Sequence, residues 1–186
     1  DLGHDVEEAA PDYDAATTGA AFGTVMCANT FANIEARANG RRPGPNDLEP
    51  VTRCHAELGS TVTARDYIRA VQTFHRAGRQ LGAFFEKHDL LLSPTLARPH
   101  LKLGTIRMDG NLQDFHEALA PMICFTSICN VTGVPAMSVP LAWTEEGLPL
   151  GLHFAARFGA DDMLFSLAAQ IEQAQPWRNR MQGVHA

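Results

Sequence analysis

One stretch, residues 125–157, constrains the fold more than any other, because it predicts a helix, a tight loop, a strand, a turn and a second strand. Its first part is an apolar run that suits a short buried helix. Gly133 predicts the end of that helix, since glycine accepts the positive φ that a helix C-terminus needs. Pro135, two residues later, prevents continuation. The helix must therefore end here, and a tight loop follows.

A hairpin is predicted directly after this helix. The apolar run over 136–143 predicts a strand, and Pro140 places it at a sheet edge or a bulge because proline cannot donate to a ladder. Residues 144–147 have the composition of a hairpin loop that ends in glycine. Apolar residues then alternate with others from 148 to 155, the period of a half-buried strand. Without further evidence, this pattern would describe a core hairpin with no chemistry.

The rest of the chain predicts helices with one further strand. Helical patterns fall at residues 12–39, 48–58, 63–85 and 111–120, with a break at Pro121, and again after Asp161. Gly19 and Gly23 share one face of the first helix, which indicates close approach of another backbone or a ligand. Residues 90–92 are wholly apolar and predict a strand buried on both faces.

Length and composition exclude several classes of protein. A chain of 186 residues is long enough for one domain that buries roughly 70 % of its unfolded surface. The net charge of −6 argues against nucleic acid and anionic membranes as partners. No apolar run reaches the length of a membrane-spanning helix. The first residues resemble the tail of a helix that runs into a strand, so we expect a fragment of a larger domain.

Metal and thiol chemistry find little support in the sequence. Eight histidines include no HxxxH pair, so a metal site would need residues brought together by the fold. The four cysteines lack CxxC spacing, which indicates reduced thiols in a cytoplasmic protein. Cys54 and His55 could be drawn as a hydrolase pair, but neighbours on a helix point in different directions. We expect no metal and no cofactor.

The hairpin region and one other segment carry motifs that match a known enzyme family at fixed spacing. The segment 89–95, D-L-L-L-S-P-T, matches one element of that family. The remaining matched positions are Asn130, Thr132, Gly133, Pro135, Ala136, Ser138 and Pro140, then Gly147, Leu148, Pro149, Gly151 and Leu152. Together these motifs resemble the amidase signature enzymes, and residues 28–37 further resemble the branch of aryl-amidases and 6-aminohexanoate-cyclic-dimer hydrolases.

The resemblance implies hydrolysis of carbon–nitrogen bonds by covalent catalysis. In such enzymes a serine attacks the amide carbonyl, a second serine and a lysine relay the proton, and backbone N–H groups stabilise the oxyanion. That lysine and the glycine- and serine-rich segment lie upstream in the family. This chain has no Ser-Ser pair, and its lysines are Lys87 and Lys102. We therefore expect no catalytic residue here, and no serine with an adjacent base.

Four residues are candidates for one wall of the substrate pocket by the same resemblance: Cys27, Asn29, Phe125 and Thr132. Cys27 and Phe125 could equally be plain core residues. Asn130 fits a role in satisfying backbone groups of its loop better than contact with substrate.

The fold class that follows is α/β, a mixed sheet flanked by helices, in one domain over residues 1–186. The function implied is that of the C-terminal part of an amidase. The alternatives are a non-catalytic module derived from the fold and an amidotransferase A-type subunit. The expected partners are the N-terminal half, a small amide substrate and, where apolar surface stays uncovered, a second copy of the chain.

Overall fold

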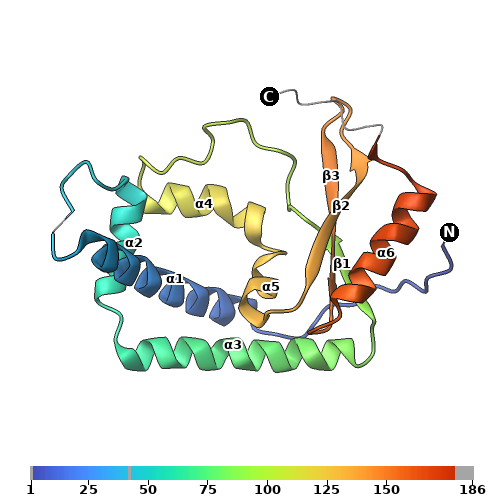
Figure 1. The fold of residues 1–186 in the computed structure, drawn as a ribbon, viewed down its shortest axis with the longest axis horizontal. Helices are drawn as coiled ribbons and strands as arrows, with labels where there is room; N and C mark the ends of the chain where they lie inside the picture. Colours follow the sequence, from blue (N-terminus) through green and yellow to red (C-terminus); the bar gives the residue numbers. More distant parts are fainter. Residues whose placement is uncertain (1, 42, 179–186) are drawn as a thin grey trace. The chain divides into compact units, whose positions relative to one another are not determined.

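The computed structural model describes residues 2–41 and 43–178. Within them the elements, labelled in Figure 1, are α1 (Ala15–Ala38), α2 (Pro50–Ser60), α3 (Ala64–Phe85), β1 (Leu90–Pro94), α4 (Leu112–Ile123), α5 (Ser127–Thr132), β2 (Ala136–Trp143), β3 (Pro149–Ala156) and α6 (Asp161–Ala174). The predicted α/β class, a sheet flanked by helices, is confirmed. No helix in the described ranges has the length and apolar character needed to cross a membrane.

The chain folds into two compact units, each made of separate segments. Within the described residues, the sheet unit comprises residues 2–12, 80–100 and 123–178, and the helical unit comprises residues 13–41, 43–79 and 101–122. Helix α3 begins in the helical unit and ends in the sheet unit. The expectation of a single domain over the whole chain stays a prediction.

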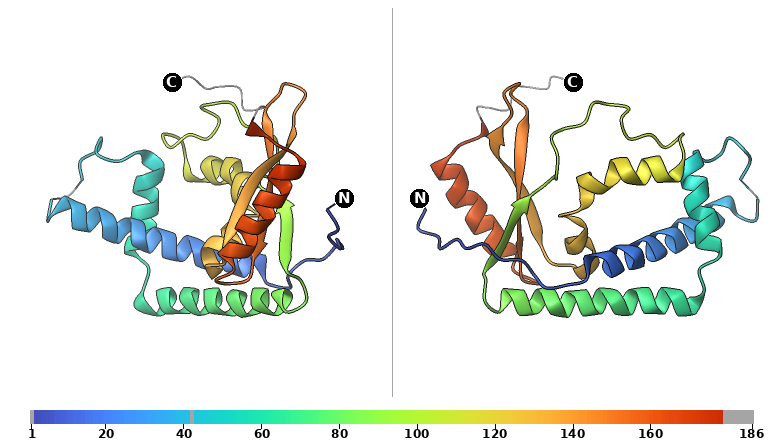
Figure 2. Two further views of the ribbon diagram at one scale, coloured as in Figure 1. Left: turned by 45° about the vertical axis from the view of Figure 1, so that its right-hand side comes forward. Right: turned by 180° about the vertical axis from the view of Figure 1, so that it is seen from behind.

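The sheet unit is built on three antiparallel strands in the order β1-β3-β2. Its core lies between one face of the sheet and α6. Both views of Figure 2 show α6 lying along that face. Val139 and Phe154 from the strands pack there with Leu164, Leu167 and Ile171 from α6. Because side chains alternate along a strand, the neighbours of Phe154 point to the opposite face.

The predicted hairpin is confirmed in detail. Strands β2 and β3 pair with Ser138 opposite His153, and the register shifts at a bulge between Pro140 and Ala142. In the described sheet β2 is also an edge strand, so both placements predicted for Pro140 are found. Gly147 takes φ +82° in the connecting turn. Gly133 takes φ +74° and donates its N–H to the carbonyl of Cys129 at 2.8 Å, which ends α5 as predicted.

Strand β1 differs from its prediction as a strand buried on both faces. In the described part of the chain it is an edge strand whose one neighbour is β3, and Leu92 is 48 % exposed. The apolar run is a poor guide here, because the number of strands beside it is set by residues far away in the sequence. The chain start differs as well, since residues 2–12 form neither helix nor strand. Contacts from His4 to Gln170 and from Glu7 to His88 hold this segment within the sheet unit.

The helical unit is organised by a close crossing of α1 and α2. Asp14 caps α1 by accepting the Thr17 N–H at 2.9 Å. A Cβ atom added to Gly59 of α2 would lie 2.0 Å from the Cys27 carbonyl oxygen and 2.9 Å from the Phe31 Cβ. Only glycine therefore allows the two backbones to meet at this point.

Two further expectations for this unit need correction. A Cβ atom at Gly19 or Gly23 would meet no described atom within 4 Å, so the close backbone approach is at Gly59 instead. Helix α4 continues through Pro121 to Ile123 rather than breaking at the proline. A proline so near the C-terminus sacrifices one hydrogen bond, which the remaining turns tolerate. Asn111 caps its start by accepting the Asp114 N–H at 2.8 Å.

Candidate functional site

The four predicted pocket residues fall in different units. Cys27 and Asn29 lie on α1 in the helical unit, whereas Phe125 and Thr132 lie beside and at the end of α5 in the sheet unit. That the four residues line one pocket stays a prediction.

Cys27 lies at the crossing of α1 and α2 and is buried, with Gly59 against its carbonyl group. Burial raises the pKa of its thiol, so the sulfur stays protonated near neutral pH. A protonated buried thiol is an apolar contact and a weak donor rather than a nucleophile. Asn29, two residues along the helix, is exposed and keeps its amide available to donate and accept.

Phe125 and Thr132 are both half-buried. The Thr132 hydroxyl donates to the Ile128 carbonyl at 2.8 Å, so its proton is already used within α5. Its oxygen can still accept a hydrogen bond. Asn130, between them, is exposed.

A polar row on the sheet was not foreseen from the sequence. Ser93 of β1, His153 of β3 and Ser138 of β2 are register partners on the face opposite α6. His153 is buried, and its Nδ1 lies 3.3 Å from the Ser93 Oγ. Burial lowers the pKa of His153, which favours the neutral ring. The expectation that no serine has an adjacent base is therefore wrong for Ser93.

The Ser93–His153 contact lacks the remaining parts of a catalytic triad. At 3.3 Å it is a long hydrogen bond, and no described carboxylate bonds to the His153 ring to orient it. Next to it, the Thr95 and Ser138 hydroxyls are 2.6 Å apart across β3. They meet there because Gly151, between them, has no side chain: a Cβ would lie 2.5 Å from the Ser138 Oγ. The alternation of Gly151 and His153 along β3 was the available signal for this face.

A second unforeseen contact joins two histidines in the helical unit. His55 of α2 and His116 of α4 approach with their Nε2 atoms 3.1 Å apart. The rings are near-parallel, at 26°, and the ring of Phe115 meets His55 edge-on. Burial lowers the pKa of His55, and the nearby His116 charge lowers it further. Since 61 residues separate the two positions, no local motif could have indicated this pair.

The helical unit also contains a cleft of about 580 Å³ between α1, α2 and the loop that joins them. Its floor is apolar, with Phe31, Ile34 and Ala56. None of the four predicted pocket residues lines it.

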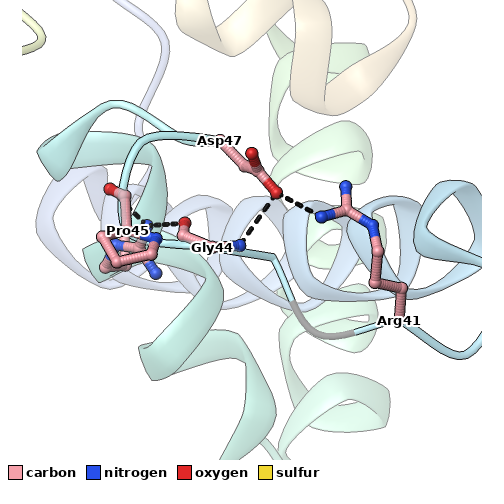
Figure 3. A network of polar contacts seen from close by, with 5 residues as sticks. Arg41, Gly44, Pro45 and Asp47 are labelled. Carbon is pink, nitrogen blue, oxygen red and sulfur yellow. Dashed lines mark hydrogen bonds and ion pairs between the residues drawn. The ribbon is translucent and has the colours of Figure 1, made fainter.

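The loop beside this cleft is held by a network of hydrogen bonds, drawn in Figure 3. The Asp47 carboxylate accepts from the Gly44 N–H at 2.8 Å and from Arg41 at 2.7 Å. The hydrogen bond from the Gly44 N–H has the larger effect and the contact with Arg41 the next; both lower the pKa of the Asp47 carboxyl. Arg53 donates to the carbonyls of Gly44 and Pro45. Arg41 and Arg53 of this network also line the cleft, and no described carboxylate forms an ion pair with Arg53.

Comparison with known proteins identifies the family. A family model described as Amidase matches residues 1–165. The chain therefore belongs to the amidase family, which confirms the resemblance of the sequence motifs. AmiC of Mycobacterium tuberculosis (strain ATCC 25618 / H37Rv) is 32 % identical over 181 residues, which cover 95 % of this chain and 37 % of AmiC.

Two solved structures test the fold. The chain is similar to 6-aminohexanoate cyclic dimer hydrolase complexed with substrate, with a TM-score of 0.83, 28 % identity, and coverage of 95 % of this chain and 39 % of that one. It is also similar to the A-type subunit of glutamyl-tRNA(Gln) amidotransferase from Thermotoga maritima, with a TM-score of 0.54, 27 % identity, and coverage of 88 % and 35 %. The chain spans less than two fifths of the length of these relatives.

Proposed function

We propose that this chain is the C-terminal part of an amidase and contributes part of its substrate pocket. The serine nucleophile, the second serine and the lysine lie outside the chain in this proposal. The observation that supports it most is the similarity to the cyclic dimer hydrolase, which extends over 95 % of the chain at a TM-score of 0.83. A likeness of that extent is expected of a part that keeps its original role in a whole enzyme.

The four predicted residues suit an amide substrate in different ways. Asn29 offers an exposed amide that can pair with both the carbonyl and the N–H of a substrate amide. Phe125 offers an aromatic surface for the carbon chain. Thr132 can only accept, because its proton goes to Ile128. Cys27 contributes a neutral thiol and sets the position of α1 at Gly59.

A hydrolase of small amides is favoured over an amidotransferase component. The two solved relatives have similar identities, 28 % and 27 %, yet the TM-scores are 0.83 for the hydrolase and 0.54 for the amidotransferase. The backbone of this chain thus follows the hydrolase more closely at equal sequence distance. The substrate class we propose is a small amide such as 6-aminohexanoate cyclic dimer, acted on in the cytoplasm, where thiols stay reduced.

The test is to produce the chain alone and together with the segment encoded upstream of it. We expect no turnover of an anilide or of 6-aminohexanoate cyclic dimer by the chain alone, because the long Ser93–His153 contact lacks the other parts of a triad and a nucleophile without an oriented base is weak. The two pieces together are expected to form a complex that hydrolyses one of these amides. Release of ammonia from glutamine would instead favour the amidotransferase.

Variants in this complex test the pocket. We expect Asn29→Ala to raise KM about tenfold, the loss of roughly one hydrogen bond, with little change in stability. Phe125→Ala is expected to change the preference among acyl groups. Gln72→Ala, at another exposed helical position, is the matched control and should change neither. Equal KM values for Asn29→Ala and the control would contradict the pocket assignment, and a monodisperse chain that ignores the upstream segment would favour a non-catalytic module.

A further inference from the structure

The His55–His116 pair has a geometry that the proposed amidase chemistry does not use. The two Nε2 atoms are 3.1 Å apart, whereas the two ring centroids are 5.3 Å apart. The centroids are thus 2.2 Å farther from each other than the nitrogens are (5.3 − 3.1). The two rings therefore meet end to end through their Nε2 atoms. In the described residues each Nε2 has the other as its hydrogen-bond partner, and no carboxylate bonds to either ring.

We propose that His55 and His116 form a binding site for one divalent transition-metal ion, with imidazole nitrogen from each ring and water in the other positions. Imidazole is a preferred ligand of Ni²⁺, Cu²⁺ and Zn²⁺. The described chain brings no third histidine, cysteine or carboxylate to the pair, so the ion would keep open positions. The proposal is independent of the amidase assignment.

The separation of the nitrogens fits two neighbouring ligands of one ion. A metal about 2.0–2.1 Å from each nitrogen would sit off the line between them, with an angle of roughly 95–102° at the metal. Opening the pair by a few tenths of an ångström would give a tetrahedral angle. The rings must tilt so that both nitrogens point at the ion. His116 is exposed on α4 and can make most of this adjustment, while buried His55 stays in place.

The elements that carry the histidines are fixed by contacts near the pair. Helix α2 is locked against α1 at Gly59. The Val51 N–H in its first turn donates to the Met108 carbonyl at 3.0 Å, which ties α2 to the segment leading into α4. The Phe115 ring packs edge-on against His55. A site on two restrained helices loses little conformational entropy when the ion binds.

Metal binding requires a change of tautomer and no other chemistry. In the hydrogen bond, one ring carries its proton on Nε2 and donates it to the other. Two metal ligands both need that nitrogen unprotonated, so the donor ring moves its proton to Nδ1. Both rings stay neutral, and the ion takes the place of the shared proton. The exposed side at His116 gives water and the ion access.

The test is calorimetric titration of Ni²⁺ into the 186-residue chain in a non-coordinating buffer at neutral pH. We expect one equivalent to bind to the pair, and His116→Gln to weaken this event at least tenfold. Glutamine can keep a hydrogen bond to His55 but is a poor metal ligand, so this variant separates metal binding from a structural role. His55→Gln should have the same effect on binding. Circular dichroism without metal checks that each variant folds.

His75→Gln provides the matched control, because His75 is another exposed histidine in the middle of a helix. Its binding of Ni²⁺ should equal that of the unchanged chain. The thermal midpoint should rise with Ni²⁺ in the unchanged chain and in this control, and stay constant in folded His116→Gln. Ni²⁺ affinity that is the same in the unchanged chain and folded His116→Gln would overturn the proposal, as would the absence of any binding event.

Discussion

Replacement of Gly59 by alanine is the most direct test of how the helical unit is built. The new methyl group would lie 2.0 Å from the Cys27 carbonyl oxygen and 2.5 Å from its carbonyl carbon. Both are backbone atoms, so no side-chain rotation can relieve the clash. Real contacts of this kind begin at 3.0–3.4 Å, and α1 and α2 would have to separate by about 1.0–1.4 Å (3.0 − 2.0 and 3.4 − 2.0).

The magnitude follows from two opposing effects. Overpacking by one methyl group costs about 1–3 kcal/mol, and more where backbone must move. Alanine returns about 1 kcal/mol of helix propensity relative to glycine. Because this clash is with backbone, we expect a net loss of about 2 kcal/mol or more. That loss corresponds to a fall in Tm of roughly 4–8 °C for a chain of this size.

Thermal unfolding followed by circular dichroism measures the effect. Gly78→Ala is the matched control, because Gly78 lies inside α3 and a Cβ there would meet no described atom within 4 Å. This variant should be more stable than the unchanged chain by up to about 1 kcal/mol. The reasoning is refuted if Gly59→Ala unfolds at the same temperature as the unchanged chain or at a higher one.

Three further results are expected. Burial lowers the pKa of His153, so the unfolded chain binds the proton more readily than the folded chain. The free energy of unfolding should therefore keep its full His153 contribution above pH 6.5 and decrease as the pH falls below that value. In urea titrations, His153→Gln should remove part of this decrease. An unchanged pH dependence in this variant would contradict the burial argument. Gly151→Ala should lower the free energy of unfolding by about 1–2 kcal/mol, because the new methyl group separates the Thr95 and Ser138 hydroxyls. In the double variant, Thr95→Ala should relieve part of that loss. Strictly additive effects of the two substitutions would show that the hydroxyl contact is not the cause. Thiol titration of the unfolded chain without reductant should count all four cysteines, whereas a count of two would indicate a disulfide.

The elements that sequence reasoning predicted well are those fixed by neighbouring residues. The β2–β3 hairpin follows from alternation along the strands and from glycine at position 147. The end of α5 follows from the left-handed conformation that Gly133 adopts. The place of Pro140 at a bulge in an edge strand follows from its missing donor. In each case the physical cause lies within a few residues of the feature.

The features that were missed depend on pairings between distant residues. The exposure of β1 depends on which strands lie beside it, and the leucines of β1 do not determine those neighbours. Ser93 meets His153 only through the strand register, 60 residues apart. The crossing at Gly59 could not be told from Gly19 or Gly23 by composition, since a glycine in a helix does not specify its neighbour. The pocket residues rested on family resemblance, and their joint arrangement stays a prediction.

The division of the chain into interleaved segments has a consequence for recombination between related genes. The helical unit is encoded in two stretches, 13–79 and 101–122, with part of the sheet unit between them. A single recombination crossover cannot exchange one unit alone, because every crossover leaves part of at least one unit with the wrong parent. Chimaeras between relatives should therefore tolerate replacement of both stretches together better than replacement of either one.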